Sequence, residues 1–327
     1  MLLSPQAKWD AVPVRFEPLS RDVAASRRFG RRAIELRGGE GLEPLEWVRA
    51  YEERLISGAV PGRLVVVDNR PTGLVSWSAA GPLGVSVHLL FVSEEDPGPE
   101  HYARVLSLIE EEAGAVAFVP GPLAGLSPDA EDRLMRSRGF RRFGRSEMVF
   151  APDTPLPAPV WGAGEKVRPV ERADLTSLAG LNRLANHDRF DRYLFLETED
   201  EQEDARRGVA GILDGRWGEF SSAGSWLCEL GGQPVGAVLS VRWPLRTLIA
   251  DVIVAPSLQG KGVGGRLLTT ALRSIRGNGE RHIYLYVTEG NEPALRLYRR
   301  LGFARSRGPT RDWYNALRIP VPPSVDA

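Results

Sequence analysis

The stretch Gln259-Gly-Lys-Gly-Val-Gly264 places three glycines at alternate positions between two apolar segments. The segment before it, Leu248–Val254, has the composition of a buried strand, and the segment after it, Gly265–Ile275, has apolar residues at helical spacing. A glycine turn that opens a helix leaves the first backbone N–H groups of that helix unpaired and accessible. The sequence therefore predicts an anion-binding loop that suits a phosphate group.

Two common kinds of phosphate loop fit this stretch poorly. A P-loop requires a serine or threonine after its lysine, and Lys261 is followed by Gly262. A dinucleotide fingerprint is formally met by Gly260, Gly262 and Gly265. That turn should follow its strand almost directly, whereas Ala255–Leu258 intervenes with a proline that ends the strand. The oxidoreductase interpretation therefore stays open only as an alternative.

A third pattern, Q-x-x-G-x-G, is met by Gln259, Gly262 and Gly264. After a strand-like run at 282–287 comes Asn291–Phe303, which reads N-x-x-A-x-x-L-Y-x-x-x-G-F. Together the two blocks resemble the two signatures of the GNAT superfamily of acyl-CoA N-acyltransferases, in the same order and at the same spacing. The resemblance implies that the glycine loop holds the pyrophosphate of acetyl-CoA.

The second block also makes physical sense as a short helix. Ala294, Leu297, Tyr298 and Leu301 fall at i, i+3, i+4 and i+7, which is one face of a helix. Asn291 is placed to cap its N-terminus. Taken alone, Tyr298 reads as core filler on that face; its position in the motif favours a ring whose polar tip faces a cleft.

Composition sets broad limits on the protein. The 327 residues suggest about two domains, and 43% hydrophobic with 26% charged residues is ordinary for a soluble globular protein. Lysine plus arginine balance aspartate plus glutamate at 42 each, so no partner of strong charge, nucleic acid or membrane, is expected. No apolar run reaches the length of a membrane span, no signal peptide is recognisable, and the single cysteine, Cys228, fits a reducing cytoplasm.

The chain reads as two halves of similar plan. The proline-rich run that starts at Ala151 predicts a linker, so we expect domains at 1–150 and 166–327 with a linker at 151–165. Matching pairs in the two halves are the first strands Val14–Leu19 and Val167–Val170, the hairpins Arg63–Trp77 (turn expected at Asn69–Gly73) and Ser225–Leu239, the strands Val85–Val92 and Leu248–Val254, and the Gly-Phe pairs at 139–140 and 302–303.

The first half lacks the residues that carry chemistry in the second. Ser93–Pro99 stands in place of the glycine loop and carries three adjacent carboxylates, which would repel a pyrophosphate. Met135 stands in place of Tyr298. We therefore expect the first half to be a degenerate copy without a CoA site.

The predicted fold class is α/β (α+β), with two tandem GNAT-like domains, each a mostly antiparallel mixed sheet flanked by helices. This arrangement is similar to that of mycothiol synthases, in which the C-terminal half is the active one. One departure is Leu248, where the pattern of those enzymes has a glutamate early in the strand. The departure leaves the acceptor open.

The resemblance assigns roles to individual residues. Tyr298 takes the place of the general acid, and a backbone N–H at Val254 or a neighbour takes that of the oxyanion donor. The general base is inferred from the residues themselves: Asp251, a carboxylate inside an apolar strand, is favoured unless it is a paired structural aspartate, with Glu229, Glu289 and His187 as alternatives. The expected CoA-binding residues are Val252, Ile253, Val254, Gln259, Gly260, Lys261, Gly262, Val263, Gly264, Gly265, Asn291, Ala294 and Tyr298.

The function expected from these features is acetyl-CoA-dependent N-acetylation of a primary amine on a small molecule. The amine attacks the thioester directly, through a tetrahedral intermediate. Two alternatives remain: an acetyltransferase for protein or peptide N-termini, and a non-catalytic acyl-CoA sensor. We expect no metal, because the histidines are scattered, and a cytoplasmic monomer or homodimer.

Overall fold

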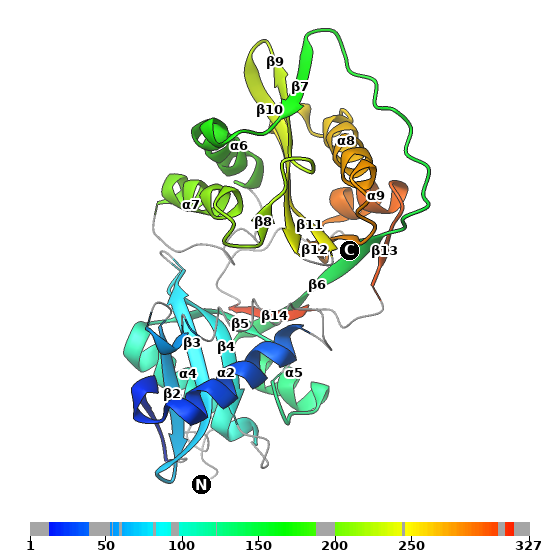
Figure 1. Ribbon diagram of the computed structural model, residues 1–327. Coiled ribbons are helices and arrows are strands. Elements are labelled where there is room, and N and C mark those ends of the chain that lie inside the picture. The colour runs from blue at the N-terminus through cyan, green and yellow to red at the C-terminus, as the bar shows by residue number, and fades with distance from the viewer. Residues whose placement is uncertain are drawn as a thin grey trace. The chain divides into compact units, whose positions relative to one another are not determined.

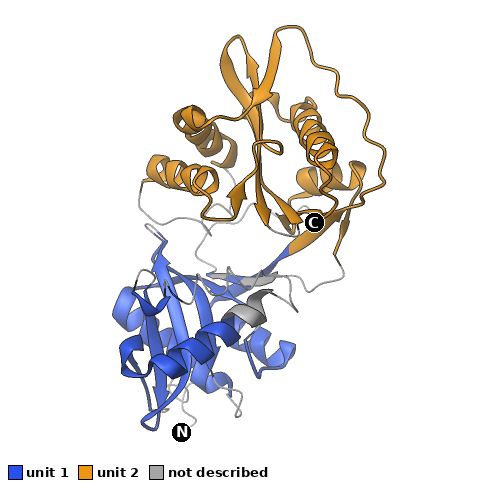
Figure 2. Ribbon diagram, viewed as in Figure 1, with its two compact units in different colours: residues 1–145, 308–321 blue, residues 146–307, 322–327 orange. Residues whose placement is uncertain are grey.

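The computed structural model describes residues 13–38, 53, 55–58, 61–80, 83–92, 98–121, 123–187, 200–243, 246–306 and 311–316. The chain forms two compact units (Figure 2). Unit 1 comprises residues 1–145 with 308–321, and unit 2 comprises residues 146–307 with 322–327. Each unit combines a mixed sheet with helices, as the sequence predicts.

Unit 1 is built on antiparallel strands that end in one parallel pair. β1 to β4 pair in chain order, and β4 pairs in parallel with β5. The apolar face of α4 is fully buried, as predicted for Tyr102, Val105, Leu106 and Ile109. The elements are β1 (Val14–Pro18), η1 (Leu19–Arg21), α2 (Val23–Gly38), β2 (Gly62–Val67), β3 (Arg70–Ala79), β4 (Val85–Val92), α4 (Pro99–Ala113), β5 (Val116–Pro120), α5 (Pro128–Ser137), β6 (Phe140–Phe150) and β14 (Arg311–Ala316).

Unit 2 follows the same plan (Figure 1). β7, β9, β10 and β11 are antiparallel neighbours, and β11 pairs in parallel with β12. The elements are β7 (Glu165–Pro169), η2 (Arg172–Asp174), α6 (Leu175–Asn186), α7 (Glu201–Leu213), β8 (Glu219–Phe220), β9 (Trp226–Leu230), β10 (Gln233–Trp243), β11 (Arg246–Val254), η4 (Pro256–Leu258), α8 (Val263–Gly277), β12 (Ile283–Thr288), α9 (Glu292–Arg300) and β13 (Phe303–Arg305).

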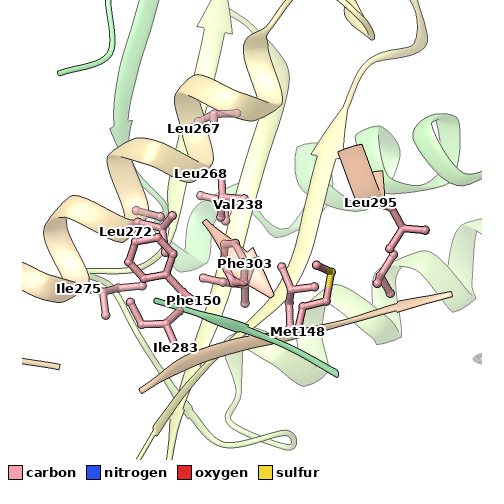
Figure 3. Close-up of a cluster of buried hydrophobic side chains, with 14 of the residues drawn as sticks. Met148, Phe150, Val238, Leu267, Leu268, Leu272, Ile275, Ile283, Leu295 and Phe303 are labelled. Atoms are coloured by element: carbon pink, nitrogen blue, oxygen red, sulfur yellow. The ribbon is translucent and has the colours of Figure 1, made fainter. Parts of the chain in front are cut away.

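Two apolar layers cover the opposite faces of the unit 2 sheet. α8 and α9 lie on one face and α6 and α7 on the other (Figure 1). Under α8, the side chains of Leu267, Leu268 and Leu272 belong to the same buried cluster as Phe150 and Phe303 (Figure 3). Burial of this many large apolar side chains is the main favourable contribution to folding of the unit.

The two units exchange their last strands. β14, which follows unit 2 in the chain, pairs with β5 and with residues 140–145 of β6 in unit 1. The end of β6 belongs to unit 2, where it pairs with β13 and lies beside β12. The compact units therefore divide the chain at points other than 150 and 165. That residues 1–150 and 166–327 form separate domains stays a prediction.

The first hairpin turns earlier than its sequence suggested. We expected the turn at Asn69–Gly73, on the proline and glycine, but the β2–β3 turn is Asp68–Asn69. Both residues have positive φ, 48° and 64°, which aspartate and asparagine tolerate and which suits the twist of a two-residue hairpin. Pro71 and Gly73 lie inside β3, where an added Cβ on Gly73 would meet the Phe91 carbonyl at 2.1 Å.

The proline-rich segment is tied to α8. Arg276 donates to the Thr154 carbonyl at 2.7 Å, and Arg273 donates to the Leu156 carbonyl at 2.5 Å. The partly buried side chains of Leu156 and Trp161 pack against the core cluster of this unit. These residues therefore form part of unit 2, although their prolines predict no regular secondary structure, and none is present at 151–164.

A charged network joins the first strand of unit 2 to its neighbours. Arg168 donates to both carboxylate oxygens of Asp174, at 2.7 and 2.8 Å, and to Glu229 at 2.8 Å. The hydrogen bonds from Arg168 lower the pKa of Asp174, against the opposing effect of its burial. Asp174 also accepts from the backbone N–H of Glu171. The network fixes the turn between β7 and α6.

Acid should weaken unit 2 through this network. Because the folded-state pKa of Asp174 is lowered, its contribution to stability is present above the unfolded pKa, about 4, and is lost as pH falls through the folded value. Asp174→Asn should cost about 1–3 kcal/mol at pH 7 and flatten the loss of stability below about pH 4. Urea unfolding across pH measures this. Asp214→Asn, at an exposed pair with Arg172, should cost under about 0.5 kcal/mol; an equal cost for both variants would contradict the prediction.

Candidate active site

Strands β11 and β12 part shortly after they pair. Of the described residues, the parallel register joins only Thr247 to Ile283 and Leu248 to Tyr284. On the other side of β11, the register with β10 passes from Leu239↔Asp251 to Ser240↔Ile249. Ala250 is thus an extra residue, a β-bulge that bends the strand just before Asp251.

Beyond the bulge, the edge of β11 that faces β12 carries backbone donors. The N–H of Ala255 donates to the Val235 carbonyl on the β10 side at 2.9 Å. Because successive residues of a strand direct their N–H groups to opposite edges, those of Val254 and Val252 face the β12 side. The side-chain amide of Gln259 donates to the Val254 carbonyl at 3.1 Å, which agrees with this direction.

The glycine loop links this strand to α8 through backbone conformations that need glycine. Gly260 has φ 76°, and Gly262, the residue before α8, has φ 83°. The N–H of Lys261 turns back onto the Leu258 carbonyl at 3.3 Å. The first bond of the helix runs from the Arg266 N–H to the Gly262 carbonyl at 3.0 Å. The N–H groups of Gly262, Val263, Gly264 and Gly265 therefore precede the first donor of the helical ladder.

Neither the glycine loop nor the first turn of α8 carries an acidic side chain that would repel a phosphate group. Gly262 has no capping side chain, and the first turn of α8 has no acidic residue. A Cβ on Gly264 would lie 3.2 Å from Val254 Cγ2, so glycine lets α8 approach the end of β11 closely. Backbone donors and the helix dipole make this an anion site. The residues present thus fit the pyrophosphate of an acyl-CoA.

Arg266 braces the loop, a role that the sequence did not reveal. Its guanidinium donates to the Lys261 carbonyl at 3.3 Å and to Glu165 at 2.5 Å, and it lies 5.0 Å from the ring centroid of Trp161. Glu165 and Trp161 lie about a hundred positions earlier in the chain. The residues around Arg266 in the sequence therefore do not indicate that it contacts Glu165 or Trp161.

The second block forms the helix that the sequence predicts. Asn291 caps α9, accepting the Ala294 N–H at 3.3 Å. Tyr298 is half-buried on the same helix and packs on Phe303, with 5.9 Å between ring centroids. The Leu297 side chain reaches the start of α8, because an added Cβ on Gly265 would lie 3.3 Å from it. α9 and the glycine loop are therefore neighbours.

The candidate bases have different surroundings. Asp251 is half-buried, beside the bulge, and accepts the side-chain amide of Asn182 on α6 at 2.7 Å. Glu229 belongs to the Arg168 network, Glu289 pairs with Arg305 at 2.8 Å, and His187 is largely exposed, 3.5 Å from Glu201. Of these groups, Asp251 is the one that lies on β11 itself.

In unit 1, the start of α4, which follows β4, differs from the start of α8, which follows β11. α4 begins at Pro99, which has no N–H to offer, and Glu100 lies in its first turn. Residues 93–97, which include Asp96 and most of the acidic segment, lie outside the described residues. Met135, at the position of Tyr298, is fully buried in α5.

Two absences hold for the part of the chain that the structure describes. No three histidine, cysteine, aspartate or glutamate side chains gather there as metal ligands would. None of its helices is both long and apolar enough to cross a membrane. Whether the site is free of metal stays a prediction.

The acetyltransferase (GNAT) family model matches residues 181–303, which include β11, the glycine loop, Tyr298 and Phe303. Residues 181–303 belong to the GNAT acetyltransferase family. The chain is 37% identical over 106 residues to the streptothricin acetyltransferase of Streptomyces lavendulae, covering 32% of this chain and 48% of the relative. It is 40% identical over 89 residues to the mycothiol acetyltransferase of Thermomonospora curvata, covering 26% and 29%. The chain thus spans less than half the length of each relative.

Solved structures support the GNAT fold over the whole chain. A GCN5-related N-acetyltransferase from Sphaerobacter thermophilus has a TM-score of 0.63 at 20% identity, covering 98% of both chains. A tandem GNAT protein from the clavulanic acid biosynthesis pathway has a TM-score of 0.57 at 14% identity, covering 94% of this chain and 98% of the other. At these identities the likeness concerns the fold, and it confirms the predicted tandem architecture.

Filling the glycine loop should abolish acetyl-CoA binding. Gly264→Glu places bulk against Val254 and a negative charge among the donors of α8, so calorimetry should show binding weakened at least ~100-fold. Glu100→Gln, in the first turn of α4, is the control and should leave binding unchanged. Loss of binding in the unit 1 variant would contradict the assignment of the site to unit 2.

Proposed function

We propose that the protein is an acetyl-CoA-dependent N-acetyltransferase that acetylates a primary amine of a small molecule. The observation that carries the proposal is the pairing of two features at the end of β11: an anion-binding loop and an open strand edge with backbone donors. The family match of residues 181–303 and the named acetyltransferase relatives support it.

The loop and α9 would hold the donor. Backbone N–H groups of Gly262, Val263, Gly264 and Gly265 would receive the pyrophosphate, and the edge of β11 at Val252 and Val254 would receive the arm that leads to the thioester. Acetyl-CoA supplies an acyl carbon already activated as a thioester. The edge of β11 at Val252 and Val254 would hold that carbon beside backbone N–H groups whose positions are fixed.

The chemical step requires stabilisation of negative charge on the acyl oxygen. An N–H directed from β11 at Val252 or Val254 is in place before the reaction, so it needs no reorganisation when the oxyanion develops. The departing thiolate then needs a proton, which we assign to the hydroxyl of Tyr298. Its ring is fixed by Phe303 while its α9 backbone lies next to the loop.

The amine must lose a proton to attack, because amines with pKa values of about 8 to 10 are protonated at neutral pH. We assign this task to Asp251, acting directly or through a water molecule. The bulge at Ala250 turns this carboxylate towards α6, where Asn182 orients it.

Removal of the Tyr298 hydroxyl tests its proposed role as the general acid. Tyr298→Phe keeps the ring contact with Phe303 and should lower kcat about 100-fold or more while leaving acetyl-CoA affinity unchanged. Tyr102→Phe removes a hydrogen bond to the Ala124 carbonyl in unit 1 and should leave kcat unchanged. Acetyl-CoA binding without turnover of any amine in a broad panel by the wild type would instead favour the sensor.

The proposed role of Asp251 as general base is tested by removing its charge and measuring kcat/KM across pH. Asp251→Asn should lower kcat/KM for the amine about 100-fold at pH 7, with a smaller deficit at high pH, where more of the amine is already neutral. Asn182→Ala, which only removes the orienting amide, should lower it by less, about 5- to 10-fold. Equal losses at all pH values in both variants would assign Asp251 a structural role.

A further inference from the structure

Arg266 reaches back from the first turn of α8 to the peptide unit between Lys261 and Gly262. Its guanidinium donates through Nη1 to the Lys261 carbonyl at 3.3 Å. A Cβ on Gly262 would lie 3.4 Å from the same Nη1 atom. Helical side chains lean towards the N-terminus of their helix, so a residue in the first turn is suited to such a contact. The guanidinium therefore lies against the peptide unit that directly precedes α8.

The orientation of this peptide unit decides the direction of one N–H group in the proposed anion site. In a trans peptide, the C=O and N–H groups point in opposite directions. The Lys261 carbonyl is directed at Arg266, so the N–H of Gly262 is directed away from Arg266. That N–H is one of the donors that precede the hydrogen-bond ladder of α8. A contact that fixes the carbonyl thus also fixes the donor.

The chain itself restrains this peptide unit only weakly. Its orientation depends on ψ of Lys261 and φ of Gly262, and glycine adopts positive and negative φ with similar ease. Gly262 has φ 83° here. The N–H of Lys261 is held by the Leu258 carbonyl at 3.3 Å, but that N–H belongs to the preceding peptide unit. Among the described residues, the hydrogen bond that acts on the 261–262 peptide unit is the one from Arg266.

Glu165 and Trp161 hold the guanidinium in place. Oε1 of Glu165 accepts from Nη2 of Arg266 at 2.5 Å, and Oε2 accepts the Gly162 N–H at 2.5 Å. The Trp161 ring centroid lies 5.0 Å from the guanidinium carbon, within reach of a cation–π contact. The exposed fractions of the two side chains are 24% for Arg266 and 14% for Glu165, so this pair is better shielded from water than a surface pair.

The carboxylate of Glu165 distinguishes positioning from simple attraction. An unpaired guanidinium beside the loop would attract a pyrophosphate through its charge. Here Glu165 lies at hydrogen-bond distance and offsets most of that charge. What Arg266 supplies instead is the direction of the Gly262 N–H. A carbonyl that accepts from a cation also polarises its peptide unit, which strengthens the N–H as a donor.

We propose that Arg266 is a positioning residue for the acyl donor: it holds the Lys261 carbonyl and so keeps the Gly262 N–H directed at the pyrophosphate. The inference rests on the proposed function, in which the glycine loop receives that pyrophosphate. It adds that preference for a donor with a pyrophosphate depends on a side chain outside the loop. It also gives a role to Glu165 and Trp161, which precede the family-matched residues 181–303.

Calorimetry and steady-state kinetics of Arg266→Met on the full chain test this role. Methionine keeps an apolar stem beside Trp161 but cannot donate to the carbonyl. The dissociation constant and KM for acetyl-CoA should rise about 10-fold, as for a lost charge-assisted hydrogen bond, with kcat at saturating acetyl-CoA unchanged. The kcat/KM for S-acetylpantetheine, which lacks the pyrophosphate, should also stay unchanged. Arg266→Lys keeps the charge without the planar fork and should recover only part of the affinity.

Arg276→Met is the matched control, because Arg276 also donates from α8 to a main-chain carbonyl, that of Thr154 at 2.7 Å, but in the last turn of the helix. It should leave acetyl-CoA affinity unchanged. Equal losses with acetyl-CoA and S-acetylpantetheine in Arg266→Met would indicate a structural role and overturn the proposal. Wild-type affinity in Arg266→Lys would overturn it too, since charge alone would then suffice.

Failure of the proposed function is recognised separately. A wild type that binds acetyl-CoA but acetylates no amine would overturn the transfer reaction, while the calorimetric comparison of Arg266→Met with Arg276→Met would still decide the role of Arg266. A wild type that does not bind acetyl-CoA would overturn both.

Discussion

The separation of β11 from β12 after Leu248 is the constraint on which the rest of unit 2 depends. In a paired strand the N–H groups donate to the neighbouring strand. Here the bulge at Ala250 bends β11, and the parallel register with β12 stops. We propose that the edge at Val252 and Val254 then receives the ligand. Gln259 returns to the Val254 carbonyl and so ties the glycine loop to the same edge.

Glycine makes the close approach of loop, helix and strand possible. The left-handed conformations at Gly260 and Gly262 reverse the chain, and the bare α-carbon of Gly264 lets α8 lie against Val254. The Arg266 contacts with Lys261, Glu165 and Trp161 then hold the loop from outside. The proposed anion site is thus fixed by backbone geometry and supported by side chains remote in sequence.

Local patterns allowed the main elements to be predicted. Apolar runs located β4 and β11, and helical spacing located α8 and α9, since these signals reside in neighbouring residues. The β2–β3 turn was placed wrongly because Pro71 and Gly73 were taken as turn residues and Asp68 was not, although all three residue types are typical of turns. The starts of α8 and α9 could be predicted because Gly262 adopts a left-handed conformation and Asn291 caps a helix, and each of these roles favours its residue type.

Long-range contacts could not be predicted in this way. Nothing near Arg266 in the sequence points to Glu165, and nothing near Tyr286 points to Glu147, because a single sequence does not reveal which distant strands become neighbours. The assignment of Asp251 rested on an isolated carboxylate in an apolar strand, and its partner Asn182 became visible only with the packing of α6. Tertiary packing decides these contacts.

The exchange of last strands has a consequence for how such a chain can change over generations. Two similar halves suggest an ancestral duplication, after which one copy is ordinarily free to be lost. Here β14 completes the sheet of unit 1, and the end of β6 completes that of unit 2. Deleting the half without a glycine loop would remove a strand from the other, so inheritance of the pair is enforced by folding, whatever the first half does chemically.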